Sequence, residues 1–171
     1  MRRHGENDDG GLDDGPDPRT RHQRERAALG ALSVVYREAD AAFSPFSCPA
    51  SGECCQLAIT RREPWLWRAE WLRVLARLKQ DGRPLPPARE DGACPLLDAS
   101  GLRCSIYADR PLGCRTFFCD RIQGPERQPV EAMEQLQRRL QRLSEALDGA
   151  EAEPRSLLTW AQRERAPKSQ P

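Results

Sequence analysis

The chain has 171 residues, an apolar fraction of 38% and a mean hydropathy of −0.76, so it can form one domain with a small core and flanking tails. Its charges are numerous but balanced, with 27 basic and 26 acidic side chains, which gives no support to a nucleic-acid-binding surface. Its uninterrupted apolar runs are only a few residues long, so no membrane span is predicted.

The N-terminal residues 1–22 are rich in Gly, Asp and Pro and show no apolar periodicity, which predicts a disordered tail. No apolar stretch follows the two arginines near the start, so the pattern of a secretory signal is missing. We therefore expect a cytoplasmic protein, in a compartment where thiols stay reduced.

Three helices are predicted from the spacing of apolar residues. The first covers 24–43, the second begins at Pro64 and ends at the "DGRP" of 81–84, and the third covers 130–147. The third has an amphipathic stripe, which predicts packing against the first helix or, alternatively, binding of a protein partner. Residues 149–171 are expected to be a partly disordered extension in which "SLLTW" forms a short docking segment.

The middle of the chain is rich in proline and cannot form one long regular element over 81–125. The predicted fold class is therefore mainly α: a small helical domain over 23–148 with an irregular, loop-rich cysteine-cluster insert at 46–122. Because such an insert has little regular structure, we expect another interaction to hold it in place.

All seven cysteines lie inside this insert, and none falls on a predicted helix. Cysteines that only fill a core are usually spread through helices and strands, whereas these sit beside Gly, Pro and Ser. Their odd number and the expected compartment argue against a permanent disulfide frame. The pattern predicts a metal site whose ligand pool is Cys48, Cys54, Cys55, Cys94, Cys104, Cys114 and Cys119.

Thiolates favour zinc, copper(I) and iron–sulfur clusters. The only histidines, His4 and His22, lie in the predicted tail, so the site should be all sulfur or sulfur with a carboxylate. Seven thiolates exceed the four ligands of one tetrahedral ion. The adjacent pair Cys54 and Cys55 suits two nearby sites, or one ligand with a neighbouring thiol.

Charged residues also flank the cysteines. Glu53 and Asp120 are candidate oxygen ligands, although a solvated surface position is the more common role for such carboxylates. Arg110 and Arg115 bracket Cys114 and are expected either to lower the pKa of nearby thiols or to pair with Asp109 and Asp120.

The segments "CPASGECC" (48–55) and "CPLLDASGLRCSIYADRPLGCRTFFC" (94–119) together resemble the CxxCxxCC cysteine-cluster family of zinc- or iron-chelating domains. The resemblance covers residues 46–122 and implies zinc or iron as the bound metal. One position departs from the family, because Ser51 stands where the opening pattern has its second cysteine. A serine hydroxyl is a poor ligand for a soft metal, so that ligand is lost or is replaced by water or a carboxylate.

Three functions are therefore weighed. The first is a metal-chelating protein that binds zinc or iron through clustered thiolates. The second is a redox or methyl-transfer enzyme with a [4Fe–4S] cluster, because flagellin lysine methylases are distantly similar through a comparable cysteine cluster. The third is an interaction module in which the metal is a structural staple. The sequence has no recognisable glycine-rich cofactor loop and no histidine in the ordered region to serve as a base, so a non-enzymatic role is favoured.

Overall fold

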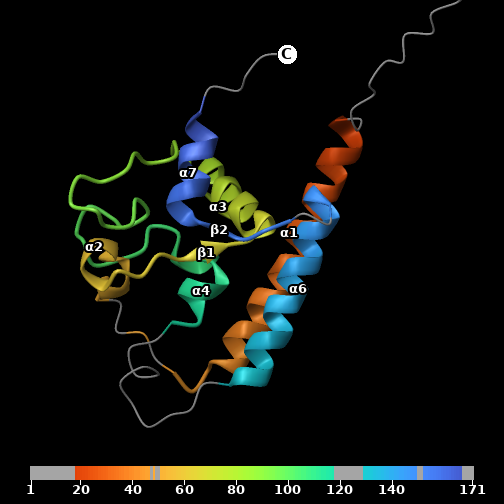
Figure 1. Ribbon diagram of the computed structural model, residues 1–171, viewed down its shortest axis with the longest axis horizontal. Coiled ribbons are helices and arrows are strands. Elements are labelled where there is room, and N and C mark those ends of the chain that lie inside the picture. Colours follow the sequence, from red (N-terminus) through yellow and green to blue (C-terminus); the bar gives the residue numbers. More distant parts are fainter. Residues whose placement is uncertain (1–17, 47, 49–50, 118–128, 150–151, 167–171) are drawn as a thin grey trace, which may run out of the picture.

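Two long antiparallel helices, α1 (Pro18–Ala42) and α6 (Val130–Asp148), form one side of the protein (Figure 1). The computed structural model describes residues 18–46, 48, 51–117, 129–149 and 152–166. The mainly α fold class predicted from the sequence is confirmed in this part of the chain. Helix α1 begins six residues earlier than predicted, so residues 18–22, which we expected in the tail, are helical.

The stripe predicted over 130–147 packs against α1, the first of its two predicted roles. The shared core between the two helices is apolar and almost fully buried, and it includes Leu32, Val35, Ala39, Phe43, Leu136 and Leu140. Burial of this face stabilises the pair, because most helical stability in proteins comes from packing of an amphipathic face. A protein partner on the exposed remainder of α6 stays a prediction.

The second predicted helix begins later than expected. Trp65 and Leu66 form strand β1 (Trp65–Leu66), which pairs antiparallel with β2 (Arg155–Ser156), and the helix α3 starts only at Arg68 (Arg68–Gln80). The Leu157 N–H donates to the Pro64 carbonyl at 2.9 Å, which continues this pairing. Pairing with a segment about ninety residues away therefore overrides the helix-start signal of Pro64.

The segment "SLLTW" forms the beginning of helix α7 (Leu157–Arg165). The Ser156 hydroxyl caps it by accepting the Thr159 N–H at 3.1 Å. The Trp160 ring stacks on Trp71 with centroids 6.2 Å apart, and its indole N–H donates to the Leu66 carbonyl at 2.9 Å. Helix α7 is thereby docked on α3 and β1.

The cysteine-rich segments are mostly loop, as predicted, with four short helical turns. These are η1 (Glu53–Cys55), α2 (Leu57–Thr60), η2 (Tyr107–Asp109) and α4 (Leu112–Arg115). Residues 96–105 form a small hairpin in which the Ser105 N–H donates to the Leu96 carbonyl at 2.7 Å. In Figure 1, α2 lies away from the α1–α6 pair, whereas α4 lies nearer to the pair and contacts α1.

The first two cysteine segments, 48–55 and 94–104, are held together through their backbones. The Cys94 N–H donates to the Cys55 carbonyl at 2.8 Å. Gly52 has a left-handed φ of 71°, and a Cβ atom there would lie 2.4 Å from the Gly101 carbonyl oxygen. Only glycine allows this approach of the first segment to the hairpin tip.

This contact predicts a difference between two glycines with nearly the same backbone. Gly101 also has a left-handed φ (74°), but a Cβ there would meet open space. Gly52→Ala should therefore lower the free energy of unfolding by about 1–3 kcal/mol more than Gly101→Ala, because it adds a backbone clash to the shared conformational cost. Urea unfolding of the two variants measures the difference, and equal losses would contradict the close approach.

Candidate metal centre

Six of the seven predicted cysteines surround one small cavity. They come from the three segments 48–55, 94–104 and 112–115, and the cavity has a volume of about 50 Å³. All six are free thiols, and they are Cys48, Cys54, Cys55, Cys94, Cys104 and Cys114. The seventh, Cys119, lies outside the described residues. The fold therefore brings together thiols up to 66 positions apart in the sequence (48 to 114).

A second cavity of about 30 Å³ adjoins the first. Four cysteines line both cavities, namely Cys54, Cys55, Cys94 and Cys114. Each cavity is large enough for a water molecule or a single ion. The adjacent Cys54 and Cys55 line both cavities, so their division between two sites stays a prediction.

The cavities lie where the two apolar cores meet. Cys94 is buried in the core formed by α3, α7 and the hairpin, and Cys55 and Cys104 pack against that core. Cys48 instead packs against the core between α1 and α6. The thiol cluster is therefore part of the packing of both halves of the described structure.

Burial and hydrogen bonds between thiols favour the protonated form of Cys54, Cys55, Cys104 and Cys114. A hydrogen bond with Cys55, followed by burial, raises the pKa of Cys54 far above its usual range. The hydrogen bond with Cys54 lowers the pKa of Cys55, but the hydrogen bond with Cys94 and burial outweigh it and bring that pKa to about 12. Burial raises the pKa of Cys104 and of Cys114. Deprotonation of one thiol is disfavoured by burial and by its neighbours.

The expected lowering of thiol pKa values by arginine is therefore wrong as a net effect. Arg62 and Arg110 do act in that direction on Cys54, but they are outweighed by burial and by the neighbouring thiol. The sequence shows which residues flank a cysteine, but it does not show how deeply the thiols are buried together.

The donor set of the cavity fits a soft metal. Neighbouring thiolates repel one another, and a bound cation offsets this repulsion. A soft metal ion can therefore replace the protons of thiols that lie side by side. Within the described ranges, no three Cys, His, Asp or Glu side chains converge as the ligands of a bound ion would. The thiols line the cavity and hydrogen-bond one another instead.

The predicted oxygen ligand Glu53 does not line the thiol cavities. Among the described residues, those lining the two cavities include neither Ser51 nor Glu53, and Glu53 is exposed. His22 lies in α1 and is exposed, whereas Asp120 is outside the described residues. The position at which this chain departs from the family pattern is thus not part of the cavity wall.

Arg115 pairs with an unpredicted partner. Its Nη1 contacts both carboxylate oxygens of Asp40, on α1, at 2.7 and 2.8 Å. Its guanidinium is buried, its Nη2 donates to the Ala108 carbonyl, and its Cζ lies 4.3 Å from the centre of the Tyr36 ring. The predicted pairing with Asp109 is wrong, because Asp109 instead faces α3.

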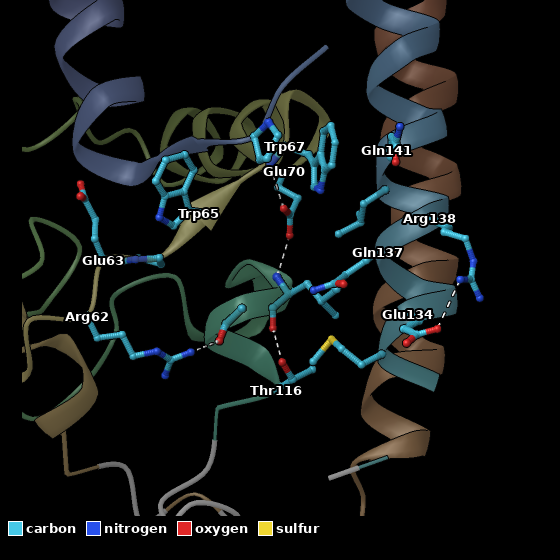
Figure 2. Close-up of a pocket in the computed structure, with 16 residues that line it drawn as sticks. Arg62, Glu63, Trp65, Trp67, Glu70, Thr116, Glu134, Gln137, Arg138 and Gln141 are labelled. Carbon is cyan, nitrogen blue, oxygen red and sulfur yellow. Dashed lines mark hydrogen bonds and ion pairs between the residues drawn. The ribbon is translucent and has the colours of Figure 1, made fainter. Parts of the chain in front are cut away.

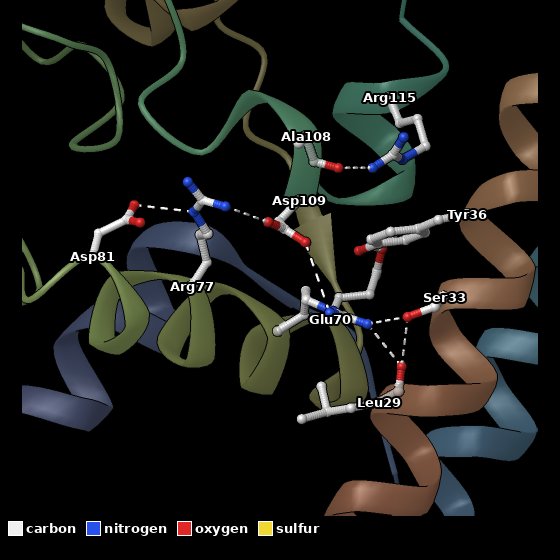
Figure 3. Close-up of polar contacts among 10 residues, drawn as sticks. Leu29, Ser33, Tyr36, Glu70, Arg77, Asp81, Ala108, Asp109 and Arg115 are labelled. Atoms are coloured by element: carbon white, nitrogen blue, oxygen red, sulfur yellow. Dashed lines mark hydrogen bonds and ion pairs between the residues drawn. The ribbon is translucent and has the colours of Figure 1, made fainter.

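Asp109 forms ion pairs with two arginines of α3, at 3.8 Å to Arg73 and 3.7 Å to Arg77 (Figure 3). Arg110 lies over the Tyr107 ring, with its Cζ 3.8 Å from the ring centre. Both Tyr107 and Arg110 line the first cavity. The turn Tyr107–Arg110 is therefore bound to α3 through Asp109, and it faces the thiols through Tyr107 and Arg110.

Glu70, which the sequence did not single out, is 1% exposed. Burial raises its pKa to about 7, against the opposing effect of three hydrogen bonds. These bonds come from the Leu112 N–H at 2.6 Å, the Trp67 N–H at 3.0 Å and the Tyr36 hydroxyl at 3.4 Å. A glutamate three residues after Trp67 is the capping signal that could have identified the first of its roles.

A larger groove of about 650 Å³ lies between α4 and α6 and contains no cysteine among its described lining residues (Figure 2). Trp65, which is 62% exposed, and Trp67 line it from the β1 side. Gln137 and Gln141 line it from α6. Leu112 and Gly113 of α4 and the following Thr116 also line this groove, so α4 lies between the groove and the thiols.

The comparisons with known proteins give one match. The model of the family CxxCxxCC, described as "putative zinc- or iron-chelating domain", matches residues 47–138, more than half of the chain. No curated protein and no solved structure shows a significant match. Within the described residues, no helix has both the length and the apolar character needed to cross a bilayer. With its cysteine segments inside the matched region, the chain belongs to the CxxCxxCC family of zinc- or iron-chelating domains.

Proposed function

We propose that this protein binds zinc or iron through the thiolates of the cavity, with Cys48, Cys54, Cys55, Cys94, Cys104 and Cys114 as the ligand pool and Cys119 as its seventh member. The observation that carries the proposal is the meeting of six free thiols from three segments around one small cavity. Family membership supports zinc or iron as the metal.

The physical basis is the free-energy cost of ionising buried thiols that lie beside one another. Without a cation, burial and neighbouring thiols keep Cys54 and Cys114 protonated in a site with little solvent. Bound zinc or iron supplies positive charge that stabilises thiolates, and its binding free energy becomes folding free energy for the loops. The chain's own part is to align the sulfurs and to exclude water.

Iron–sulfur chemistry is the alternative use of the same ligands. A brown preparation obtained without oxygen, with visible sulfur-to-iron absorption, would favour a cluster, whereas a colourless zinc-loaded protein would count against it.

Six reduced thiols in one cavity also suit a reducing compartment, and we infer a cytoplasmic location on that ground.

Removal of the metal should loosen the cysteine segments and spare the helix pair. We expect a strong chelator to increase amide hydrogen exchange over 48–60 and 92–115, while α1 and α6 keep their protection because their core is apolar. Exchange measured by mass spectrometry before and after chelation tests this. Unchanged exchange across the cysteine segments, in a protein shown to have lost its metal, would sink the proposal.

Substitution of one cavity thiol should lower the metal content. Cys94→Ser replaces a buried thiol with a hydroxyl that is a poor soft-metal ligand, and we expect a fall in metal affinity of at least about tenfold. Ser51→Ala is the matched control, since Ser51 does not line either cavity among the described residues. Elemental analysis after dialysis against a competing chelator compares them. A loss in Ser51→Ala as large as in Cys94→Ser would place position 51 in the ligand set.

A further inference from the structure

Cys114 sits on a helix that cannot hold its own position. Helix α4 has only four residues, Leu112–Arg115, and a single helical turn is not stable alone in water. Cys114 is its third residue and lines both thiol cavities. The direction of its thiol therefore depends on contacts made by the residues on either side of it.

The first end of α4 is anchored by Glu70. The Leu112 N–H donates to Glu70 Oε1 at 2.6 Å, and Figure 2 shows the carboxylate of α3 pointing at the start of α4. The same carboxylate accepts the Trp67 N–H and the Tyr36 hydroxyl. One buried group thus links α4 to α3 and to α1.

The second end is anchored by Arg115. Its buried guanidinium contacts both oxygens of Asp40 and lies over the Tyr36 ring. It also donates to the Ala108 carbonyl (Figure 3). Arginine combines one nitrogen for the carboxylate, a second nitrogen for the Ala108 carbonyl and a flat face for the ring, whereas lysine has only one nitrogen and no flat face. Between the two anchors, the Gly113 carbonyl accepts Arg62 Nη2 at 3.1 Å. The residues two before, one before and one after Cys114 are each held.

We propose that Glu70 and Arg115 are positioning residues that fix Cys114 at the metal cavity by anchoring the two ends of helix α4. The proposal rests on the proposed metal-binding function and adds two residues that touch no metal. Both anchors also contact Tyr36 of α1: Glu70 accepts its hydroxyl, and Arg115 lies over its ring. Tyr36 thus connects both ends of α4 to the α1–α6 pair.

A double-mutant cycle with Co²⁺ as the probe tests the proposal. Arg115→Lys should weaken Co²⁺ binding by about 10- to 100-fold, the usual effect of losing a partner that orients a ligand, and should reduce sulfur-to-cobalt absorption. In a Cys114→Ser background, the same change should weaken Co²⁺ binding by less than about threefold, because the side chain it positions is gone. Arg68→Lys, which disturbs an ion pair with Asp148 away from α4, is the matched control and should leave binding unchanged.

Two results would overturn the proposal: no change of affinity in Arg115→Lys, or the same loss with and without Cys114, which would mean a general effect on folding. If Arg115→Lys does not fold, Glu70→Gln takes its place, because it keeps the size of the side chain but turns one acceptor into a donor facing a backbone N–H.

A second measurement needs no metal. Iodoacetamide labelling of the metal-free chain, followed by mass spectrometry, should show faster alkylation of Cys114 in Arg115→Lys than in the unmodified chain, with Cys94 unchanged. Equal rates at Cys114 would overturn the proposal. Failure of the unmodified chain to bind Co²⁺ or Zn²⁺ would instead contradict the proposed function, and the labelling result would still decide whether the anchors hold Cys114.

Discussion

Burial of several thiols beside one another is the constraint around which this protein is arranged. Burial raises the pKa of Cys104 and Cys114, and hydrogen bonds with neighbouring thiols together with burial raise the pKa of Cys54 and Cys55. Yet Cys94 lies inside one apolar core, and Cys48 packs against the other. The two cores therefore share a group of neutral thiols, and ionisation of these thiols is unfavourable unless a cation compensates the charge. The proposed metal chelation would supply that charge and hold the loops that form the wall of the cavity.

The helices act as the platform for that wall. Helices α1 and α6 bury their apolar faces against each other, and α3 is joined to α7 by the stacked Trp71 and Trp160. From this platform, Glu70, Asp40 and Tyr36 reach the short helix that carries Cys114. The close approach of Gly52 to Gly101 and the backbone hydrogen bond between Cys94 and Cys55 hold the first two cysteine segments together. The loops are thus positioned by a few polar and backbone contacts rather than by regular structure of their own.

Sequence patterns predicted the parts of this arrangement that depend on local spacing. The apolar stripe of 130–147 and the loop-rich cysteine insert follow from periodicity and proline content, and both are found. The start of α3 was misplaced, because β1 depends on pairing with Arg155 and Ser156 far along the chain. Asp40 and Glu70 were missed for a similar reason. A single carboxylate on a helix does not reveal that its partner is Arg115 or the backbone of Leu112, which only the tertiary fold brings near.

X-ray absorption at the metal edge of the purified, metal-loaded protein tests the central claim most directly. The account predicts a first coordination shell made mainly of sulfur, at about 2.3 Å for zinc, with about four sulfur neighbours for each ion. A first shell of nitrogen and oxygen alone, in a chain loaded with zinc or iron, would show that the metal is held elsewhere. It would contradict the assignment of the cysteine cavity as the metal centre.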